Sequence, residues 1–341
     1  MKRRTLFQVS LGLGLLGAVG VDKMIGIAGA TTRHAAKVGE LQWRERPLLG
    51  LGTTLSLRVA HRDPEVAERA LDSAVATIRH VESQMSLFDT SSALSRLNRD
   101  GLLNDPHPDF LRILRIAQDV STRSHGTFDI TVQPLWQVFE AAQIKQGLPS
   151  KVSVSEARDR VGWQALDISP RQVRFMKPGM GITLNGIAQG YAADMVRHQL
   201  QASGIEHALI NTGEWAALGQ PDPRHGWVLG IANPRDENQL ITSLLMDGRS
   251  IATSADNQTI FSSDFRHHHI FDPRTGYSPP ELASVTVAAT SCTMADALTK
   301  VMFVAGMQRA LTLARQWQVD VLLVDKAGKW RMTDGLKLAK I

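Results

Sequence analysis

The sequence has little cysteine, little net charge and few long apolar runs. Its 341 residues include one cysteine, Cys292, so no disulfide can form within the chain. Core packing explains this residue better than catalysis does. The formal net charge is +5, and no run of Lys or Arg follows the first few residues. This composition lacks the basic footprint of a nucleic-acid-binding protein, although 43% hydrophobic residues can bury a large core.

The first thirty residues are predicted to be an export signal. A basic start is followed by an apolar, glycine-rich stretch over 9–21 and by Ala28-Gly29-Ala30, a small-x-small cleavage pattern. The stretch is too short and too glycine-rich for a convincing membrane span. Arg3-Arg4 followed by Thr5-Leu6-Phe7 resembles a twin-arginine signal, which exports folded proteins; an ordinary Sec signal is the alternative. We expect a periplasmic mature chain over 31–341.

Helical and strand patterns interleave irregularly along the rest of the chain. Alternation predicts a strand over 52–60, and Asp63 as N-cap opens a helix that runs to Met85. Ser153 and Glu156 predict a capping box. Further helices are expected over 108–124, 188–202, 294–304 and 308–317, and short strands over 166–168, 173–175, 182–184, 207–211, 227–231, 242–245, 284–289 and 319–324. This order predicts an α+β fold of mixed sheets with packed helices, in one compact unit of two sub-domains.

The stretch "ITLNGIAQGYAADMV" (182–196) reads as strand, glycine turn and helix. Such a turn points backbone N–H groups at an anion, often a phosphate. Gly186 and Gly190 are four residues apart, so neither the dinucleotide fingerprint nor a Walker loop is present. Plain close packing of helix and strand is the alternative.

The stretch "CTMADALTKVMF" (292–303) places Asp296, Thr299 and Lys300 on one helical face, with Thr293 as the expected N-cap. A carboxylate and a hydroxyl on one face suit a hard cation such as Mg²⁺. The alternative is a first-turn Asp that favours the helix dipole.

Two further stretches carry polar groups in apolar surroundings. In "RHHHIFDPRTGY" (266–277), consecutive histidines of a strand point opposite ways, so His267, His268 and His269 cannot all reach one metal. One of them is expected to face a site. In "SHGTFDITVQPL" (124–135), Asp129 is predicted inside an apolar strand, where it needs a backbone donor or a ligand as its partner.

Six motifs in order resemble the FAD:protein FMN transferases, the ApbE-like family. They are "LGTTLSL", "VESQMSLFDTSSALSRLN", "GTFDITVQPL", "LNGIAQGYAADMV", "HIFDPRTGY" and "SVTVAATSCTMADAL". The resemblance implies that FMN is moved from FAD to a Thr or Ser of an exported flavoprotein through a phosphoester, with Mg²⁺ assisting. The acceptor would carry an Asp-x-x-Ser/Thr-Gly type motif.

The resemblance also implies roles for individual residues. His269 or Asp272 would assist proton removal, and the Ala192 carbonyl, Asp296 and the Thr299/Lys300 pair would hold Mg²⁺. Residues near FAD would be Leu51, Phe88, Thr127, Phe128, Asp129, Asn185, Gln189, Met195 and Phe271.

Several positions depart from the family pattern. Leu51, Gln189 and Lys300 stand where Met, Lys and Thr are usual, and "TGEW" replaces Gly-Gly-Asp/Glu. With the twin-arginine signal, these features resemble the NosX branch, which is implicated in maturing NosR, a membrane flavoprotein serving nitrous oxide reductase. A non-catalytic periplasmic FAD or FMN carrier stays open as an alternative, and the missing fingerprint makes a nicotinamide oxidoreductase remote.

Overall fold

The computed structural model describes residues 40–339. The predicted export signal therefore lies outside the described residues. Within them, no helix has the length and apolarity needed to cross a membrane.

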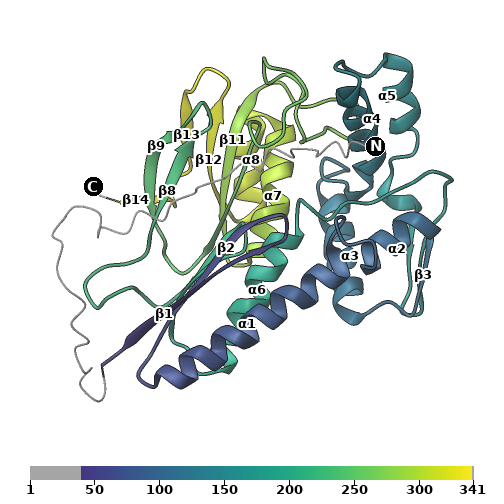
Figure 1. Ribbon diagram of the computed structural model, residues 1–341. Coiled ribbons are helices and arrows are strands. Elements are labelled where there is room, and N and C mark those ends of the chain that lie inside the picture. The colour runs from purple at the N-terminus through teal and green to yellow at the C-terminus, as the bar shows by residue number, and fades with distance from the viewer. Residues whose placement is uncertain (1–39, 340–341) are drawn as a thin grey trace, which may run out of the picture.

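An eight-stranded antiparallel sheet forms the centre of the molecule, in the order β1-β2-β6-β7-β10-β11-β12-β13 (Figure 1). Strands consecutive in the chain pair as β1-β2, β6-β7, β10-β11, β11-β12 and β12-β13, whereas β2-β6 and β7-β10 join strands that are distant in the chain. Its strands are β1 Gln42–Gly50, β2 Thr53–His61, β6 His207–Asn211, β7 Trp215–Leu218, β10 Ser250–Ala255, β11 Leu282–Ala289, β12 Asp320–Asp325 and β13 Trp330–Met332.

Helices cover one face of this sheet and a small sheet covers the other. Alternate residues of β2, such as Leu55 and Leu57, pack against buried apolar side chains of α1 and α6. On the opposite face, Trp215 and Ile251 pack against Trp227. The covering elements are α1 Pro64–Met85, α6 Ala188–Ala202, α7 Cys292–Ala305 and α8 Met307–Trp317, and on the other face the strands β8 Val228–Asn233, β9 Asp236–Leu245 and β14 Lys337–Leu338.

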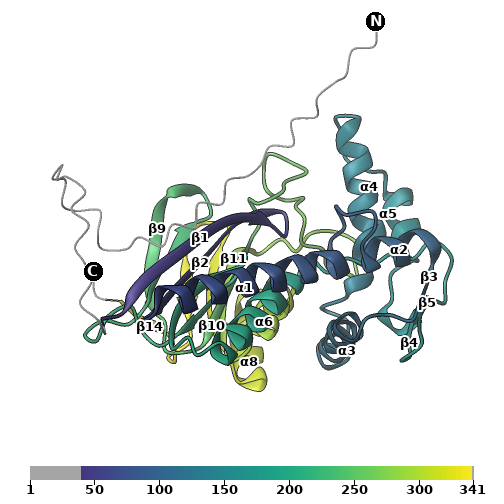
Figure 2. The same ribbon diagram turned by 60° about the horizontal axis from the view of Figure 1, so that its bottom comes forward.

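A second group of elements lies beyond the end of α1, at the right of Figures 1 and 2. It holds a three-stranded sheet in the order β3-β5-β4 and four helices. The elements are α2 Ala93–Asp100, β3 Leu102–Asn104, α3 Pro108–Arg123, α4 Gln133–Ile144, α5 Lys151–Arg158, β4 Leu166–Ile168 and β5 Gln172–Phe175, with 3-10 turns η2 Ile130–Val132 and η3 Trp163–Ala165.

Most predicted elements form close to their expected bounds. Helix α6 has the predicted ends, and the Asp63 carboxylate caps α1 by accepting from the Glu65 N–H at 2.9 Å. One predicted strand and two predicted caps are wrong. Residues 182–184 form no strand, Ser150 rather than Ser153 caps α5, and Ser291 rather than Thr293 caps α7.

Candidate functional site

The site is built where α6 crosses α7. A Cβ on Gly190 would lie 2.3 Å from the carbonyl oxygen of Cys292, so glycine alone allows the two helices to approach this closely. The Gly190 N–H donates to Asp296 Oδ2 at 3.0 Å. Close packing and polar contact therefore coincide at the predicted glycine turn.

Asp194 joins the same two helices at the start of α7. Its Oδ1 accepts from the Cys292 N–H, and its Oδ2 accepts from the Thr293 N–H, both at 2.9 Å. These backbone donors are left unpaired at every helix N-terminus, and here a neighbouring helix supplies the acceptor. Arg197 pairs with the Asp194 carboxylate at 3.3 Å.

Asp296 and Lys300 form an ion pair in the interior. Lys300 Nζ lies 2.5 Å from Asp296 Oδ1, and the Asp296 side chain is fully buried. The Lys300 stem passes over Gly186, whose Cβ would lie 3.1 Å from Lys300 Cε. Thr299 Oγ1 donates to the Asp296 carbonyl at 2.6 Å and lies 2.7 Å from Ser254 Oγ. The structure thus brings together the three residues that the sequence placed on one face.

Glu214 is a buried member of the site that the sequence analysis did not assign. Its Oε2 accepts from the Thr253 N–H at 2.9 Å. Burial, and then the nearby Asp296 carboxylate, raise the pKa of Glu214 well above its ordinary value. Burial therefore favours the protonated, neutral form of this carboxyl group. The signal in the sequence was an acidic residue next to the apolar run 215–218.

The tip of the β1–β2 hairpin reaches the start of α6. Gln189 Nε2 donates to the Leu51 carbonyl at 3.3 Å, and the Gln189 carbonyl accepts from Thr212 Oγ1 at 2.8 Å. A Cβ on Gly213 would lie 2.4 Å from Gln189 Cδ, so the neighbouring loop closes tightly over this side chain. Phe88, with 78% of its surface exposed, lies beside this hairpin tip.

Helix α6 begins without a side-chain cap. Within residues 40–339, the backbone N–H groups of Gly186 and Gln189 have no hydrogen-bond partner. Unpaired N–H groups at a helix start carry partial positive charge. Together with the Lys300 ammonium, they make the turn a candidate anion site.

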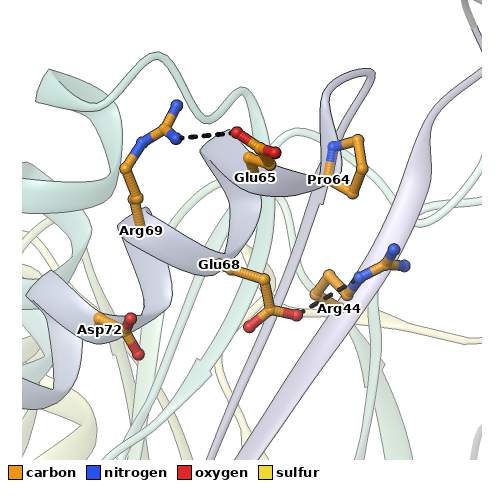
Figure 3. Close-up of a pocket in the computed structure, with 6 residues that line it drawn as sticks. All are labelled: Arg44, Pro64, Glu65, Glu68, Arg69 and Asp72. Carbon is orange, nitrogen blue, oxygen red and sulfur yellow. Dashed lines mark hydrogen bonds and ion pairs between the residues drawn. The ribbon is translucent and has the colours of Figure 1, made fainter.

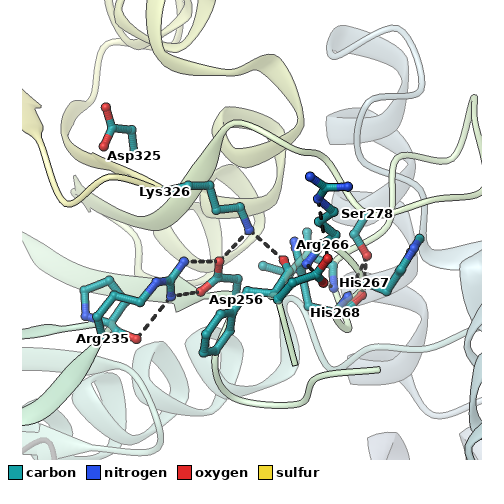
Figure 4. Close-up of polar contacts among 12 residues, drawn as sticks. Arg235, Asp256, Arg266, His267, His268, Ser278, Asp325 and Lys326 are labelled. Atoms are coloured by element: carbon teal, nitrogen blue, oxygen red, sulfur yellow. Dashed lines mark hydrogen bonds and ion pairs between the residues drawn. The ribbon is translucent and has the colours of Figure 1, made fainter. Parts of the chain in front are cut away.

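The segment with three histidines is an irregular loop rather than the expected strand. It is anchored on fully buried Asp256, which binds Arg235 at 2.6 and 2.8 Å and Lys326 at 2.5 Å (Figure 4). Lys326 also donates to the Phe265 carbonyl at 2.9 Å. The Ser278 hydroxyl bridges the His268 N–H and carbonyl. Lys326 therefore holds this segment at Phe265, and Ser278 holds it at His268.

The two predicted bases have different surroundings. Burial and the nearby Lys300 charge lower the pKa of His269 to about 4, and its Nδ1 has no hydrogen-bond partner among the described residues. His269 is therefore neutral at pH 7. Both carboxylate oxygens of Asp272 accept from the Arg274 guanidinium, at 2.9 and 2.8 Å.

Asp129 does not lie in a strand. It caps the 3-10 turn η2: Oδ1 accepts from the Thr131 N–H and hydroxyl, and Oδ2 from the Trp163 N–H. Burial raises the pKa of the Asp129 carboxyl. The partner that the sequence required is thus supplied by backbone and hydroxyl donors of the protein.

The other predicted FAD residues differ in exposure. Phe128 is in the main core, and Phe271 packs with Phe139 and Phe261 under α4 and α5. Thr127 is buried and donates to the Ser124 carbonyl at 2.7 Å. Asn185 is exposed and Met195 is partly buried. Ala192, whose carbonyl was predicted to bind Mg²⁺, is buried in α6.

A separate hollow lies between β1 and the first turns of α1 (Figure 3). Its walls carry ion pairs, Arg44 with Glu68 and Arg69 with Glu65, each at 3.4 Å. Exposed pairs of this kind contribute little to stability. The hollow shares no residue with the site at α6 and α7.

The sheet and its helical layer form an α+β fold that matches solved structures of ApbE flavin transferases. Flavin transferase ApbE from Vibrio cholerae aligns with a TM-score of 0.74 at 23% identity, over 86% of this chain and 97% of that one. The ApbE protein from Thermotoga maritima aligns with a TM-score of 0.73 at 26% identity, over 86% and 97%. These matches confirm the predicted fold.

Residues 51–323 match the ApbE family. An FAD:protein FMN transferase of Klebsiella pneumoniae (strain 342) is 29% identical over 292 residues, which is 81% of this chain and 87% of that protein. The chain belongs to the ApbE family, as the ordered motifs predicted.

Proposed function

We propose that the protein is an FAD:protein FMN transferase acting on an exported flavoprotein. The uncapped start of α6, beside the partly buried Lys300 ammonium, carries this proposal because it offers a place for the FAD pyrophosphate. The relative from Klebsiella pneumoniae bears the name of this activity. Exposed Phe88 beside the hairpin tip offers an apolar surface for a flavin or adenine ring.

In the proposed reaction, a Thr or Ser hydroxyl oxygen of the acceptor attacks the FMN-side phosphorus of FAD. A new phosphorus–oxygen ester bond forms, and the bond to the AMP oxygen breaks. AMP leaves with the electron pair, and the hydroxyl proton passes to a base. Negative charge gathers on the pyrophosphate, where the Gly186 and Gln189 N–H groups and Lys300 oppose it.

His269 is the better candidate for the base. Its ring is neutral at pH 7 and its Nδ1 is unpaired in the described part of the chain, whereas Asp272 is held by Arg274. His269→Ala should therefore lower the transfer rate much more than Asp272→Asn, measured as AMP release in single-turnover assays.

The groups implied for Mg²⁺ do not fit that ion as they stand. Both Asp296 oxygens already accept hydrogen bonds, and one of them faces an ammonium group. A protonated lysine has no lone pair to offer a metal. We propose that Lys300 supplies the positive charge of the site. The assistance of Mg²⁺ that the resemblance implied for this chain stays a prediction.

The variant Lys300→Thr tests this proposal. The native protein should transfer FMN in the presence of EDTA, whereas Lys300→Thr should lose about 10²-fold in rate without Mg²⁺ and regain activity with it. Equal EDTA sensitivity of both proteins would show that Lys300 does not replace the metal.

The acceptor is proposed to be an exported or membrane flavoprotein with an Asp-x-x-Ser/Thr-Gly motif, and NosR is the specific candidate. Intact-mass spectrometry of the acceptor after incubation with FAD should show one added FMN, with AMP released. Bound FAD without any adduct would instead favour the carrier function.

We also propose that the mature chain works in the periplasm after twin-arginine export. Replacing Arg3-Arg4 by Lys-Lys should trap the precursor in the cytoplasm. Normal export of this variant would indicate the Sec route.

A further inference from the structure

Three potential metal ligands meet where α1 and α3 approach each other. His80 Nε2 lies 2.9 Å and His107 Nδ1 lies 3.5 Å from the same atom, Asp109 Oδ2. The three ligand atoms all lie within 4.8 Å of one another. Among residues 40–339, no other group of three His, Cys, Asp or Glu side chains is gathered in this way.

These spacings suit a small transition-metal ion. Zinc lies about 2.0–2.1 Å from nitrogen and oxygen ligands in a tetrahedron, which puts neighbouring ligand atoms about 3.3 Å apart. The distances from His80 Nε2 and His107 Nδ1 to Asp109 Oδ2 bracket this value. Two imidazoles and one carboxylate suit zinc or copper, whereas Mg²⁺ prefers an all-oxygen shell. We propose that His80, His107 and Asp109 bind a divalent ion of the zinc class.

The backbone and a neighbouring helix fix the positions of two ligands. His107 lies between Pro106 and Pro108, with φ −57° and ψ 143°, and a residue before proline is restricted to this extended region. Tyr191 donates its hydroxyl hydrogen to Asp109 Oδ1 at 3.0 Å. That bond orients the carboxylate so that Oδ2 faces the imidazoles, as outer partners of metal ligands do.

The cluster is open to solvent. The exposed side-chain fractions are 32% for His80, 44% for His107 and 19% for Asp109. An ion can therefore enter directly, and water can complete a fourth coordination position.

A purely structural role for the same residues has to be separated from this proposal. His107 Nδ1 accepts from the Asp109 N–H at 3.1 Å and so caps α3. The same lone pair would bind the ion, so capping and coordination compete. Serine is a good N-cap but a poor zinc ligand. His107→Ser therefore keeps the cap and removes the ligand.

A bound ion would connect three helices. His80 belongs to α1, Asp109 to α3, and Tyr191 to α6, where it directly follows Gly190 of the anion site. The ion would thus lock the first turn of α6 against the second group of elements. Its expected effect is a higher melting temperature, because it binds only the folded chain.

The test is calorimetric titration of the untagged, EDTA-treated protein with Zn²⁺, with melting temperatures measured in parallel. We expect one Zn²⁺ per chain and a rise in melting temperature. His80→Gln and His107→Ser should each weaken binding at least tenfold. His225→Gln is the matched control, because exposed His225 pairs with Asp222 at 2.8 Å without a second imidazole.

Several outcomes would overturn the proposal. These are the absence of binding heat, equal binding by the native protein and both cluster variants, and an equal response to Mg²⁺. Loss of binding in His225→Gln would also contradict it, since the ion would then occupy another place. None of these readouts depends on flavin transfer, so the metal site can fail while the proposed function stands.

Discussion

Two carboxylates of this protein differ in whether the chain provides a cationic partner for them. Asp296 is fully buried and carries its own cation, the Lys300 ammonium, together with a backbone N–H. Asp109 is partly exposed and is surrounded by two imidazoles and a phenol hydroxyl, none of which is permanently charged. This difference underlies both proposals: the chain itself supplies the cation at Asp296, whereas a bound metal ion would supply it at Asp109.

The largest effect is expected from Asp296→Asn. It leaves the Lys300 ammonium in the interior without a counter-charge, which costs about 3–5 kcal/mol in the free energy of unfolding. Urea unfolding of the FAD-free protein measures this loss. The double variant Asp296→Asn/Lys300→Gln should recover much of it. A double variant as unstable as Asp296→Asn alone would show that the charge pair is not the cause.

Glu214→Gln tests whether the buried site holds a neutral carboxyl. The folded pKa of Glu214 is raised above its unfolded value, so its contribution is complete below the unfolded pKa and is lost as pH rises toward the folded pKa. The native protein should lose at most about 1.4 kcal/mol per pH unit in that range. Glutamine resembles the protonated acid, so the variant should show a flatter dependence in unfolding measurements from pH 5 to pH 8.

The variant Asp129→Asn tests a third carboxylate, which accepts hydrogen bonds only from uncharged backbone and hydroxyl donors. The variant retains only part of this hydrogen bonding, so the FAD-free protein should lose about 2 kcal/mol of stability. An unchanged melting temperature with weaker FAD binding in fluorescence titration would instead indicate that Asp129 acts on the ligand.

The smallest effect is expected from Asp109→Asn without added metal. Asparagine can still accept from Tyr191 through Oδ1, so about 1 kcal/mol of stability should be lost. A loss as large as that of Asp296→Asn would remove the contrast between the two carboxylates.

The sequence predicted the parts of this molecule that depend on local patterns. Helix α6 and the shared face of Asp296, Thr299 and Lys300 follow from periodicity and spacing, and the ordered motifs identified the family. Single capping residues were harder to place, because Thr293 and Ser291 are both good caps two positions apart.

Other features depend on contacts between distant segments. Asp194 caps a helix that begins 98 residues later, and nothing in either stretch indicates that partner. Asp129 looked like a strand residue because its neighbours are apolar, but a turn supplies its donors. Glu214 and Asp256 are buried acidic residues whose partners come from other strands or loops, so their environment cannot be read from nearby residues.

The hydrogen bond from Gly190 to Asp296 joins residues that are 106 positions apart in the chain. Its two partners are therefore synthesised at different times. The ribosome makes roughly 5–20 residues per second, so Asp296 emerges roughly 5–20 s after Gly190. During that interval α6 has neither the partner of its glycine nor the lysine of its turn. A nascent chain therefore cannot hold an anion at this turn by the arrangement described here until Asp296 and Lys300 have been made.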